Sequence, residues 1–202
     1  MGDAGKALEA YPVGSFIHTN RLPGTAAAAT SAVKRAHRRG DLLRVGKGVY
    51  FKGPKTRYGM ARPPAAAIAR EVLGDTGAGP TGFSAARAFG LTTQVPAQPS
   101  YVVTGRHVPT GLPGVKVSTR ANPARATLKA LEIAVLELLR GDWESTVDDG
   151  WTALVEAVGN AVASGRVRWR ALTAAADNEK SPSLRRYLER LGTDLQASGI
   201  LA

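Results

Sequence analysis

The sequence has no cysteine, only three histidines and no long apolar run. The lack of cysteine excludes disulfide scaffolds, Cys-ligated zinc, iron–sulfur clusters and thiol nucleophiles. His18, His37 and His107 lie singly, with no ligand spacing to one another, so the sequence predicts no metal site and no cofactor. No segment approaches the roughly 18 apolar residues of a membrane helix, and residues 1–11 lack the apolar stretch of a signal peptide. We therefore expect a cytoplasmic protein.

Acidic residues are scarce in only one part of the chain. The whole sequence has 27 lysines and arginines against 16 aspartates and glutamates, a net charge of +11 and a pI near 10.4. Residues 1–62 hold twelve basic and three acidic side chains, whereas the other 140 residues hold fifteen and thirteen. Because a general compositional bias would spread the charge along the chain, this asymmetry predicts one surface built for a polyanion. Nucleic acid is the first expected partner and an anionic membrane surface the second.

Turn-forming residues divide the chain into two predicted domains. The stretch 53–59 is rich in glycine, proline and basic residues, and we expect an exposed connector there. A first domain is therefore placed at residues 1–55 and a larger one at residues 62–202. In the second, the pattern predicts short strands at 92–95, 101–104 and 115–118, and helices at 63–73, 80–90, 126–140, 148–163, 169–177 and 184–196.

A glycine-rich stretch, residues 74–82, lies between two of these helices. A phosphate-binding loop should follow a buried strand and end in Gly-Lys-Ser/Thr, and this stretch does neither. We expect a plain loop. Asp148 and Asp149 precede a predicted helix, whose N-terminus favours negative charge, so helix initiation is their first interpretation and catalysis a distant second.

One helix of the first domain has a basic face. Thr25 is a suitable N-cap, residues 26–39 have high helix propensity, and Gly40 is expected just beyond the C-terminus. Ala29, Val33 and Ala36 share one face and are expected to pack inward. Residues three, four and seven apart along a helix lie on the same side, which defines an opposite, polar face. Its members are Ser31, Lys34, Arg35 and Arg38.

A basic hairpin follows this helix at once. Two apolar, β-prone runs flank a Gly-Lys-Gly turn with Lys47 at its tip. A basic helix followed by a basic hairpin is the order of recognition helix and wing in a winged helix-turn-helix, where the helix enters the major groove and the wing lies on phosphates. The alternative is a solvated surface helix beside an ordinary hairpin. We expect Ser31, Lys34 and Arg35 at base edges and Arg38, Arg39, Arg44 and Lys47 at phosphates.

Several segments resemble one family, the AbiEi-type antitoxins of abortive-infection toxin–antitoxin systems. Residues 13–52, above all Leu43-Arg44-Val45-Gly46-Lys47-Gly48-Val49-Tyr50, resemble the winged helix of that family. Other segments resemble the second domain of the family, namely Thr56-Arg57-Tyr58-Gly59, Pro63-Pro64, Thr81-Gly82 and Leu91-Thr92-Thr93-Gln94-Val95-Pro96. The resemblance covers roughly residues 13–118, and the helical remainder matches only in general character.

The resemblance implies both a fold and a function. The fold is α+β and mainly helical, with an N-terminal winged helix-turn-helix followed by a larger antitoxin domain that has a small sheet and C-terminal helices. The function is that of an antitoxin that represses its own operon by binding repeats in promoter DNA and counters a nucleotidyltransferase-like toxin encoded beside it. The expected partners are double-stranded promoter DNA and that toxin, and no membrane.

Other functions stay open at this stage. The role of Thr92, Thr93 and Gln94 is either a polar contact site or the start of a strand. The antitoxin could act as an atypical kinase that phosphorylates its toxin, although the Gly-rich, Val-Ala-Ile-Lys and His-Arg-Asp signatures of kinases are missing. It could instead inhibit the toxin by direct binding, through the apolar stripe of the 126–140 helix. A plain transcriptional regulator is a further alternative.

Overall fold

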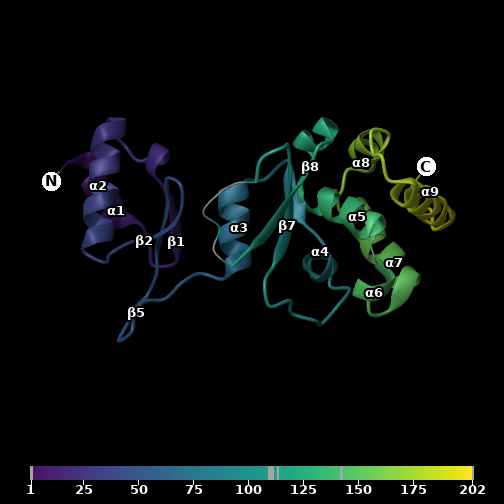
Figure 1. Cartoon of the computed structure of the whole chain (residues 1–202), viewed down its shortest axis with the longest axis horizontal. Helices are drawn as coiled ribbons and strands as arrows, with labels where there is room; N and C mark the ends of the chain where they lie inside the picture. The colour runs from purple at the N-terminus through teal and green to yellow at the C-terminus, as the bar shows by residue number, and fades with distance from the viewer. Residues whose placement is uncertain (1, 109–111, 113, 142, 202) are drawn as a thin grey trace. The chain divides into compact units, whose positions relative to one another are not determined.

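The computed structural model describes residues 2–108, 112, 114–141 and 143–201, and Figure 1 shows its elements in chain order. The predicted class is confirmed, since the chain is α+β and mainly helical, with small sheets and C-terminal helices. It divides into two units, residues 1–72 with 110–113 and residues 73–109 with 114–202. The first unit thus extends beyond residue 55, where the sequence predicted its end, and includes most of helix α3.

The first unit begins with a helix that the sequence analysis does not predict, α1. The elements of this unit are α1 (Asp3–Ala10), β1 (Ser15–His18), the 3-10 turn η1 (Thr19–Arg21), α2 (Ala26–Arg38), β2 (Leu43–Gly46), β3 (Val49–Lys52), β4 (Lys55–Thr56), β5 (Gly59–Met60) and α3 (Ala65–Leu73).

Strand β3 is the centre of a three-stranded antiparallel sheet with the order β1-β3-β2. Its four residues pair with all four residues of β1, from Ser15 opposite Lys52 to His18 opposite Val49. Buried apolar side chains from the sheet and from α1 and α2, among them Leu8, Ile17 and Val33, form the core beneath it. The sheet and the two helices therefore make one packed body.

Lys52, the last residue of β3, fastens α1 to the sheet. Its ammonium group donates to the carbonyl oxygens of Leu8 at 3.1 Å, Glu9 at 2.9 Å and Tyr11 at 2.7 Å. A helix leaves its last carbonyls without intrahelical donors, and a cation there also suits the helix dipole. The ammonium group of Lys52 is therefore hydrogen-bonded to the backbone within the fold, although the sequence analysis counts this residue among the basic residues of the first domain.

The predicted connector at 53–59 contains most of a small hairpin, β4–β5. Lys55 pairs with Met60 and Thr56 with Gly59 in an antiparallel ladder. Gly53 N donates to Met60 Sδ at 3.2 Å, and Thr56 Oγ1 donates to the Gly59 carbonyl at 2.8 Å. Residues 54–59 are all exposed, as predicted, but the ladder was not predicted because two paired residues are too few to produce a periodic pattern.

The second unit contains a small mixed sheet and the C-terminal helices. Its elements are β6 (Ala78–Pro80), α4 (Phe83–Ala88), β7 (Ser100–Thr104), β8 (Lys116–Arg120), the 3-10 turn η2 (Pro123–Thr127), α5 (Ala130–Arg140), α6 (Trp143–Thr146), α7 (Gly150–Ala163), α8 (Trp169–Ala176) and α9 (Pro182–Ala197). In the sheet, β6 pairs antiparallel with β7, and β7 pairs parallel with β8.

Helix α5 is the centre of the second unit. Every residue from 132 to 139 is buried, and Figure 1 shows α5 between the sheet and the other C-terminal helices. A helix that is apolar on nearly all sides is expected where neighbours cover the whole of it. No helix in the described part of the chain is long and apolar enough to cross a bilayer.

Two sequence predictions about strands were wrong. The stretch 74–82, expected to be a loop, contains strand β6. The close approach of β6 to α5 requires a glycine at position 79. A Cβ at Gly79 would lie 2.7 Å from the Ala130 carbonyl oxygen and 2.7 Å from Ile133 Cβ. Conversely, residues 92–95 form no strand and lie in an irregular loop.

Candidate nucleic-acid interface

Helix α2 separates a packed face from an exposed one, as its sequence pattern predicts. The Thr25 hydroxyl accepts a hydrogen bond from Ala28 N at 3.2 Å and begins the helix, and Gly40 follows its end with φ of 75°. The packed face consists of Ala29, Ala32, Val33 and Ala36, each at most 5% exposed. The helix is therefore fixed on one side and presents the other.

The exposed side of α2 carries cations that no acidic side chain neutralises. Lys34, Arg35 and Arg38 are all exposed, with exposed Ser31 one turn before Arg35. Within the described part of the chain, none of these three cations has an ion pair or a side-chain hydrogen bond. A polyanion can therefore approach this face without first breaking an internal ion pair.

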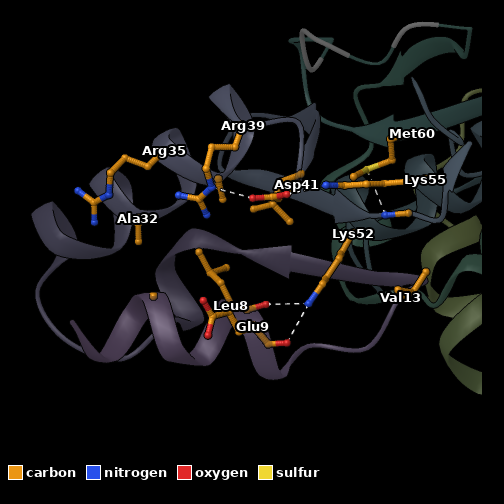
Figure 2. Close-up of a pocket in the computed structure, with 14 residues that line it drawn as sticks. Leu8, Glu9, Val13, Ala32, Arg35, Arg39, Asp41, Lys52, Lys55 and Met60 are labelled. Carbon is orange, nitrogen blue, oxygen red and sulfur yellow. Dashed lines mark hydrogen bonds and ion pairs between the residues drawn. The ribbon is translucent and has the colours of Figure 1, made fainter. Parts of the chain in front are cut away.

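Arg39 differs from those three residues, because it already has an acidic partner. Its Nε donates to Asp41 Oδ2 at 2.8 Å, and Lys55 Nζ donates to Asp41 Oδ1 at 2.7 Å. Figure 2 shows Asp41 between these two cations. The hydrogen bonds from Lys55 and then from Arg39 lower the pKa of Asp41, so its carboxylate is ionised at neutral pH. The structure thus places Arg39 apart from the unpaired cations with which the sequence grouped it.

The β2–β3 hairpin lies where its sequence predicts it. The first residue of β3, Val49, is already opposite His18 at the end of β1, so only the Lys47-Gly48 turn extends past the sheet. Arg44 is exposed on β2, and its Nε has only a long contact of 3.4 Å with the Gly46 carbonyl. Lys47 is exposed and, within the described residues, unpaired. The hairpin therefore presents two exposed cations, Arg44 on β2 and Lys47 on the short turn.

The end of this hairpin is held by neighbouring elements of the same unit. Thr19 donates to the Gly48 carbonyl through both its amide, at 2.9 Å, and its hydroxyl, at 3.0 Å. A Cβ at Gly46 would lie 2.8 Å from a methyl group of Val72, so α3 packs closely against β2. His18 Nε2 lies 2.6 Å from Glu71 Oε1, which adds a second contact between α3 and the sheet. Lys47 is thus carried on a fixed turn.

The Thr92–Gln94 segment in the second unit is a loop held by Asp148. The carboxylate of Asp148 accepts from Thr92 Oγ1 at 2.9 Å and from Thr93 N at 3.0 Å, while Asp148 N donates to the Leu91 carbonyl at 2.9 Å. The side chain of Gln94 is exposed and makes no hydrogen bond to any described residue. Thr92 and Asp148 therefore shape the loop, and Gln94 is left to solvent.

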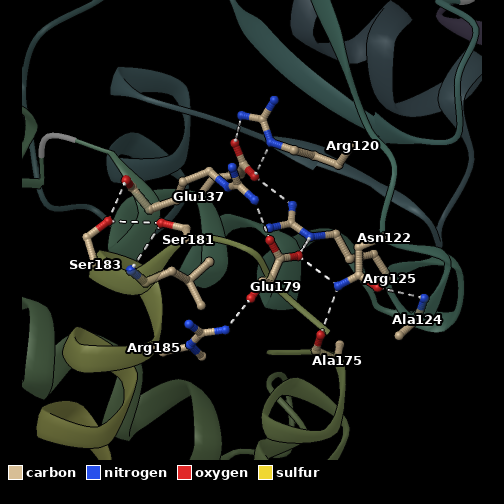
Figure 3. Close-up of polar contacts among 12 residues, drawn as sticks. Arg120, Asn122, Ala124, Arg125, Glu137, Ala175, Glu179, Ser181, Ser183 and Arg185 are labelled. Atoms are coloured by element: carbon tan, nitrogen blue, oxygen red, sulfur yellow. Dashed lines mark hydrogen bonds and ion pairs between the residues drawn. The ribbon is translucent and has the colours of Figure 1, made fainter. Parts of the chain in front are cut away.

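A buried charge network that the sequence analysis does not identify lies beside α5. Glu137, Glu179 and Arg125 each have side chains only 1% exposed. Arg125 bridges the two carboxylates, with Nη1 at 2.6 Å from Glu137 and Nε at 2.5 Å from Glu179. Figure 3 shows Arg120 meeting Glu137 on the far side of that carboxylate. Arg140 pairs with the other oxygen of Glu179.

The carboxylate of Glu179 in this network is ionised. Burial alone would raise the pKa of Glu179, but hydrogen bonds from Asn122 and Arg125 outweigh it and leave that pKa below its usual value. Asn122 Nδ2 lies 2.8 Å from Glu179 Oε1 and 2.9 Å from the Ala175 carbonyl. The network therefore joins β8, η2, α5 and the loop between α8 and α9, and its role is structural. Among the described residues, no three His, Asp or Glu side chains gather as metal ligands do.

Comparisons with known proteins find similarity in fold. No profile of a protein family matches the chain, and no curated protein matches it significantly. The crystal structure of the RV2827C protein from Mycobacterium tuberculosis is similar, with a TM-score of 0.50 and 16% sequence identity. The alignment covers 96% of this chain and 79% of that protein. At this level of identity the similarity describes the arrangement of the elements and nothing finer.

Proposed function

We propose that the first unit binds double-stranded DNA through the exposed face of α2. The observation that carries the proposal is the set of three unpaired cations, Lys34, Arg35 and Arg38, on one face of a helix whose other face is packed. Neutralising phosphates releases condensed counterions, which makes such a face a strong binder of duplex DNA. The fixed backbone beneath it keeps the cations in one register, as sequence recognition requires.

The order of the elements supports a winged helix-turn-helix as the form of this binding. A helix, a strand, a short helical turn and a second helix precede a hairpin, and β1 closes the three-stranded sheet. In this proposal α2 lies in the major groove, where Ser31, Lys34 and Arg35 face base edges. Arg38, Arg44 and Lys47 contact phosphates, with Lys47 on the short turn. Arg39 contributes less than the sequence suggests because Asp41 holds it.

The wider role follows from the resemblance to AbiEi-type antitoxins over residues 13–118. We propose a cytoplasmic antitoxin that represses its own operon through promoter DNA and counters a nucleotidyltransferase-like toxin. The division into two units is consistent with this proposal, since the residues proposed to bind DNA all lie in the first unit and leave the second for the toxin. Antitoxicity is accordingly assigned to the second unit.

The experiment that tests DNA binding compares two charge-matched triple variants of the full chain. One is Lys34→Ala/Arg35→Ala/Arg38→Ala, and the other removes three exposed cations of the second unit by Arg106→Ala/Arg170→Ala/Lys180→Ala. Binding to duplexes from the region upstream of the gene, and to scrambled duplexes, is titrated at several salt concentrations. The α2 variant should lose binding by at least about a hundredfold, because three phosphate or base contacts are removed. Equal losses in the two variants would contradict the proposed interface.

A further inference from the structure

A groove of about 550 Å³ lies within the first unit, between α1, the C-terminal half of α2 and the β4–β5 hairpin. Figure 2 shows Leu8 and Glu9 on one side and Ala32, Arg35 and Arg39 of α2 on the other. Its volume falls in the range of about 300 to 1,000 Å³ that is usual for small-molecule sites. The site is therefore large enough for a ligand and is built entirely from residues of one unit.

The floor of this groove is apolar. Leu8 and Leu42 lie at its base, at 8% and 4% exposed, and Ala32 and Ala36 contribute the small side chains that leave the space open. Val13 lies on the rim and is 63% exposed, an unusual position for a branched apolar side chain. An apolar surface that is hollow and accessible favours a ligand with an apolar body.

The charges around the groove are predominantly positive. Its charged lining residues are four cations, Arg35, Arg39, Lys52 and Lys55, and two anions, Glu9 and Asp41. Lys52 is occupied by three carbonyl oxygens, and Asp41 is shared by Arg39 and Lys55. Arg35 has no partner among the described residues. The Glu9 carboxylate likewise has no side-chain partner among the described residues, but cations outnumber anions in the lining by two, and the guanidinium of Arg35 pairs well with a carboxylate.

The β4–β5 hairpin makes one wall, and a glycine lets it fold back over the groove. A Cβ at Gly53 would lie 2.5 Å from the Ala61 carbonyl oxygen and 2.7 Å from Phe51 Cε1, so no other residue fits there without a backbone shift. The Lys55–Asp41 ion pair then ties the hairpin to the residues that follow α2. This wall places Met60, a flexible apolar side chain, against the space.

We propose that this groove binds a small-molecule carboxylate with an apolar tail, such as a medium-chain fatty acid. The tail lies against Leu8, Leu42 and Met60, and the carboxylate pairs with Arg35 at the mouth. The excess of cations in the lining favours an anionic ligand. The apolar floor disfavours a hydrophilic anion such as free phosphate.

Binding at this site competes with DNA, and this second step rests on the proposed function. Arg35 lines the groove and also belongs to the exposed face of α2. A carboxylate on Arg35 removes one of the three free cations of that face and adds a negative charge beside the other two. The ligand therefore lowers DNA affinity, and the chain is a repressor that an apolar carboxylate releases.

The test begins without DNA. The fluorescence of 1-anilinonaphthalene-8-sulfonate, an apolar anion, is titrated with the full chain, and the bound dye is displaced by decanoate or by decanol. Decanoate should displace it about tenfold more effectively than the neutral alcohol, because only decanoate pairs with Arg35. Val13→Asp, at an exposed rim position away from α2, should weaken dye and decanoate binding by about tenfold through repulsion. Val95→Asp, which alters another exposed valine, in the second unit, is the matched control.

Three results would overturn the groove as a carboxylate site. These are dye binding that does not saturate, equal displacement by decanol, or equal behaviour of Val13→Asp and Val95→Asp. The link to DNA is tested separately, since decanoate should weaken duplex binding in the wild-type chain and should need about tenfold more decanoate to do so in Val13→Asp. Unchanged duplex affinity in the presence of bound decanoate would overturn that link. If the chain binds no DNA while decanoate still binds, the proposed function fails and the groove does not.

Discussion

Arg39 donates a hydrogen bond through Nε to Asp41 Oδ2 at 2.8 Å, and this contact sets Arg39 apart from the other cations near α2. The same carboxylate holds Lys55 at 2.7 Å, so one anion restrains two cations at the edge of the proposed DNA face. Exposed ion pairs contribute little to stability, typically less than about 1 kcal/mol. The consequence of this arrangement is therefore expected in DNA binding and not in the fold.

Replacing Asp41 with asparagine should tighten DNA binding. The change frees Arg39 and Lys55 for phosphates and removes a negative charge beside them. Each additional phosphate contact steepens the plot of log affinity against log salt concentration by about 0.9. The slope should therefore steepen by the amount expected for one or two additional contacts. Duplex titrations at several salt concentrations measure this slope. Asp3→Asn, at an exposed acid in α1, controls for net charge, and an equal effect of both variants would count against a specific role for Asp41.

Arg35→Ala and Lys47→Ala should affect DNA binding in different ways. Arg35, facing a base edge, should contribute about 1 to 3 kcal/mol of discrimination, so its loss should reduce the preference for the operator over a scrambled duplex. Lys47, on the turn, should contact phosphate, so its loss should weaken all duplexes alike and flatten the salt slope by about one contact. Titration of both variants on both duplexes gives the comparison. Two identical losses would leave DNA binding in place and remove this division of roles.

The features that the sequence predicts correctly are those that depend on neighbours along the chain. The capping by Thr25, the helix that follows and the inward face of Ala29 and Val33 all follow from local propensity and helical periodicity. The strands at 100–104 and 116–120 and the last three helices are likewise predicted close to where they occur. The sequence patterns of these elements are long enough, or are bounded clearly enough by turn-forming residues, to be recognised without knowledge of the tertiary structure.

The features that sequence analysis misses depend on residues far apart in the chain. Arg125 meets Glu179 across 54 positions, and neither residue type is usual in a core. Strand β6 exists because Gly79 allows a close approach to α5, although glycine and proline have low strand propensity. The loop at 92–95 is irregular because Asp148 binds Thr92 and Thr93 across more than 50 positions. Only the tertiary structure contains these causes.

Thr92 and Gln94 should respond differently to substitution, although both belong to one motif. Thr92→Val removes the hydroxyl that donates to Asp148 and leaves the carboxylate short of a donor, so the chain should lose about 1 to 2 kcal/mol of unfolding free energy. Gln94→Ala removes an exposed side chain without a hydrogen-bond partner among the described residues and should change stability by less than about 0.5 kcal/mol. Urea unfolding measures both values. A loss of toxin rescue in a stable Gln94→Ala variant would identify Gln94 as a contact residue, and equal destabilisation by both changes would refute the structural assignment.

Removing one carboxylate from the buried network should destabilise the second unit strongly. In Glu179→Gln, Arg125 keeps its charge in a site only 1% exposed but retains only Glu137 as an acidic partner. Breaking a buried ion pair in this way typically costs about 3 to 5 kcal/mol, so a similar loss is expected. Glu189→Gln, at an exposed position on α9, should change stability by less than about 0.5 kcal/mol. A small effect of Glu179→Gln would mean that water replaces the carboxylate and that the network is less isolated than its burial indicates.

The same carboxylate should make stability depend on pH in the acid range. The pKa of Glu179 is lower in the folded chain than its ordinary value of 4.5, so the folded state binds this proton less readily than the unfolded state does. Its contribution is therefore complete above pH 4.5 and is lost as the pH falls through the lower folded pKa. Urea unfolding at pH 7, 5, 4 and 3 should show that, below pH 5, the unfolding free energy of the wild-type chain falls more steeply with acid than that of Glu179→Gln. The difference in slope should correspond to at most one additional proton taken up on unfolding. The gap between the two chains should thus narrow with acid. Parallel pH profiles would show that Glu179 has the same proton affinity in both states and would contradict the ionised, hydrogen-bonded carboxylate described above.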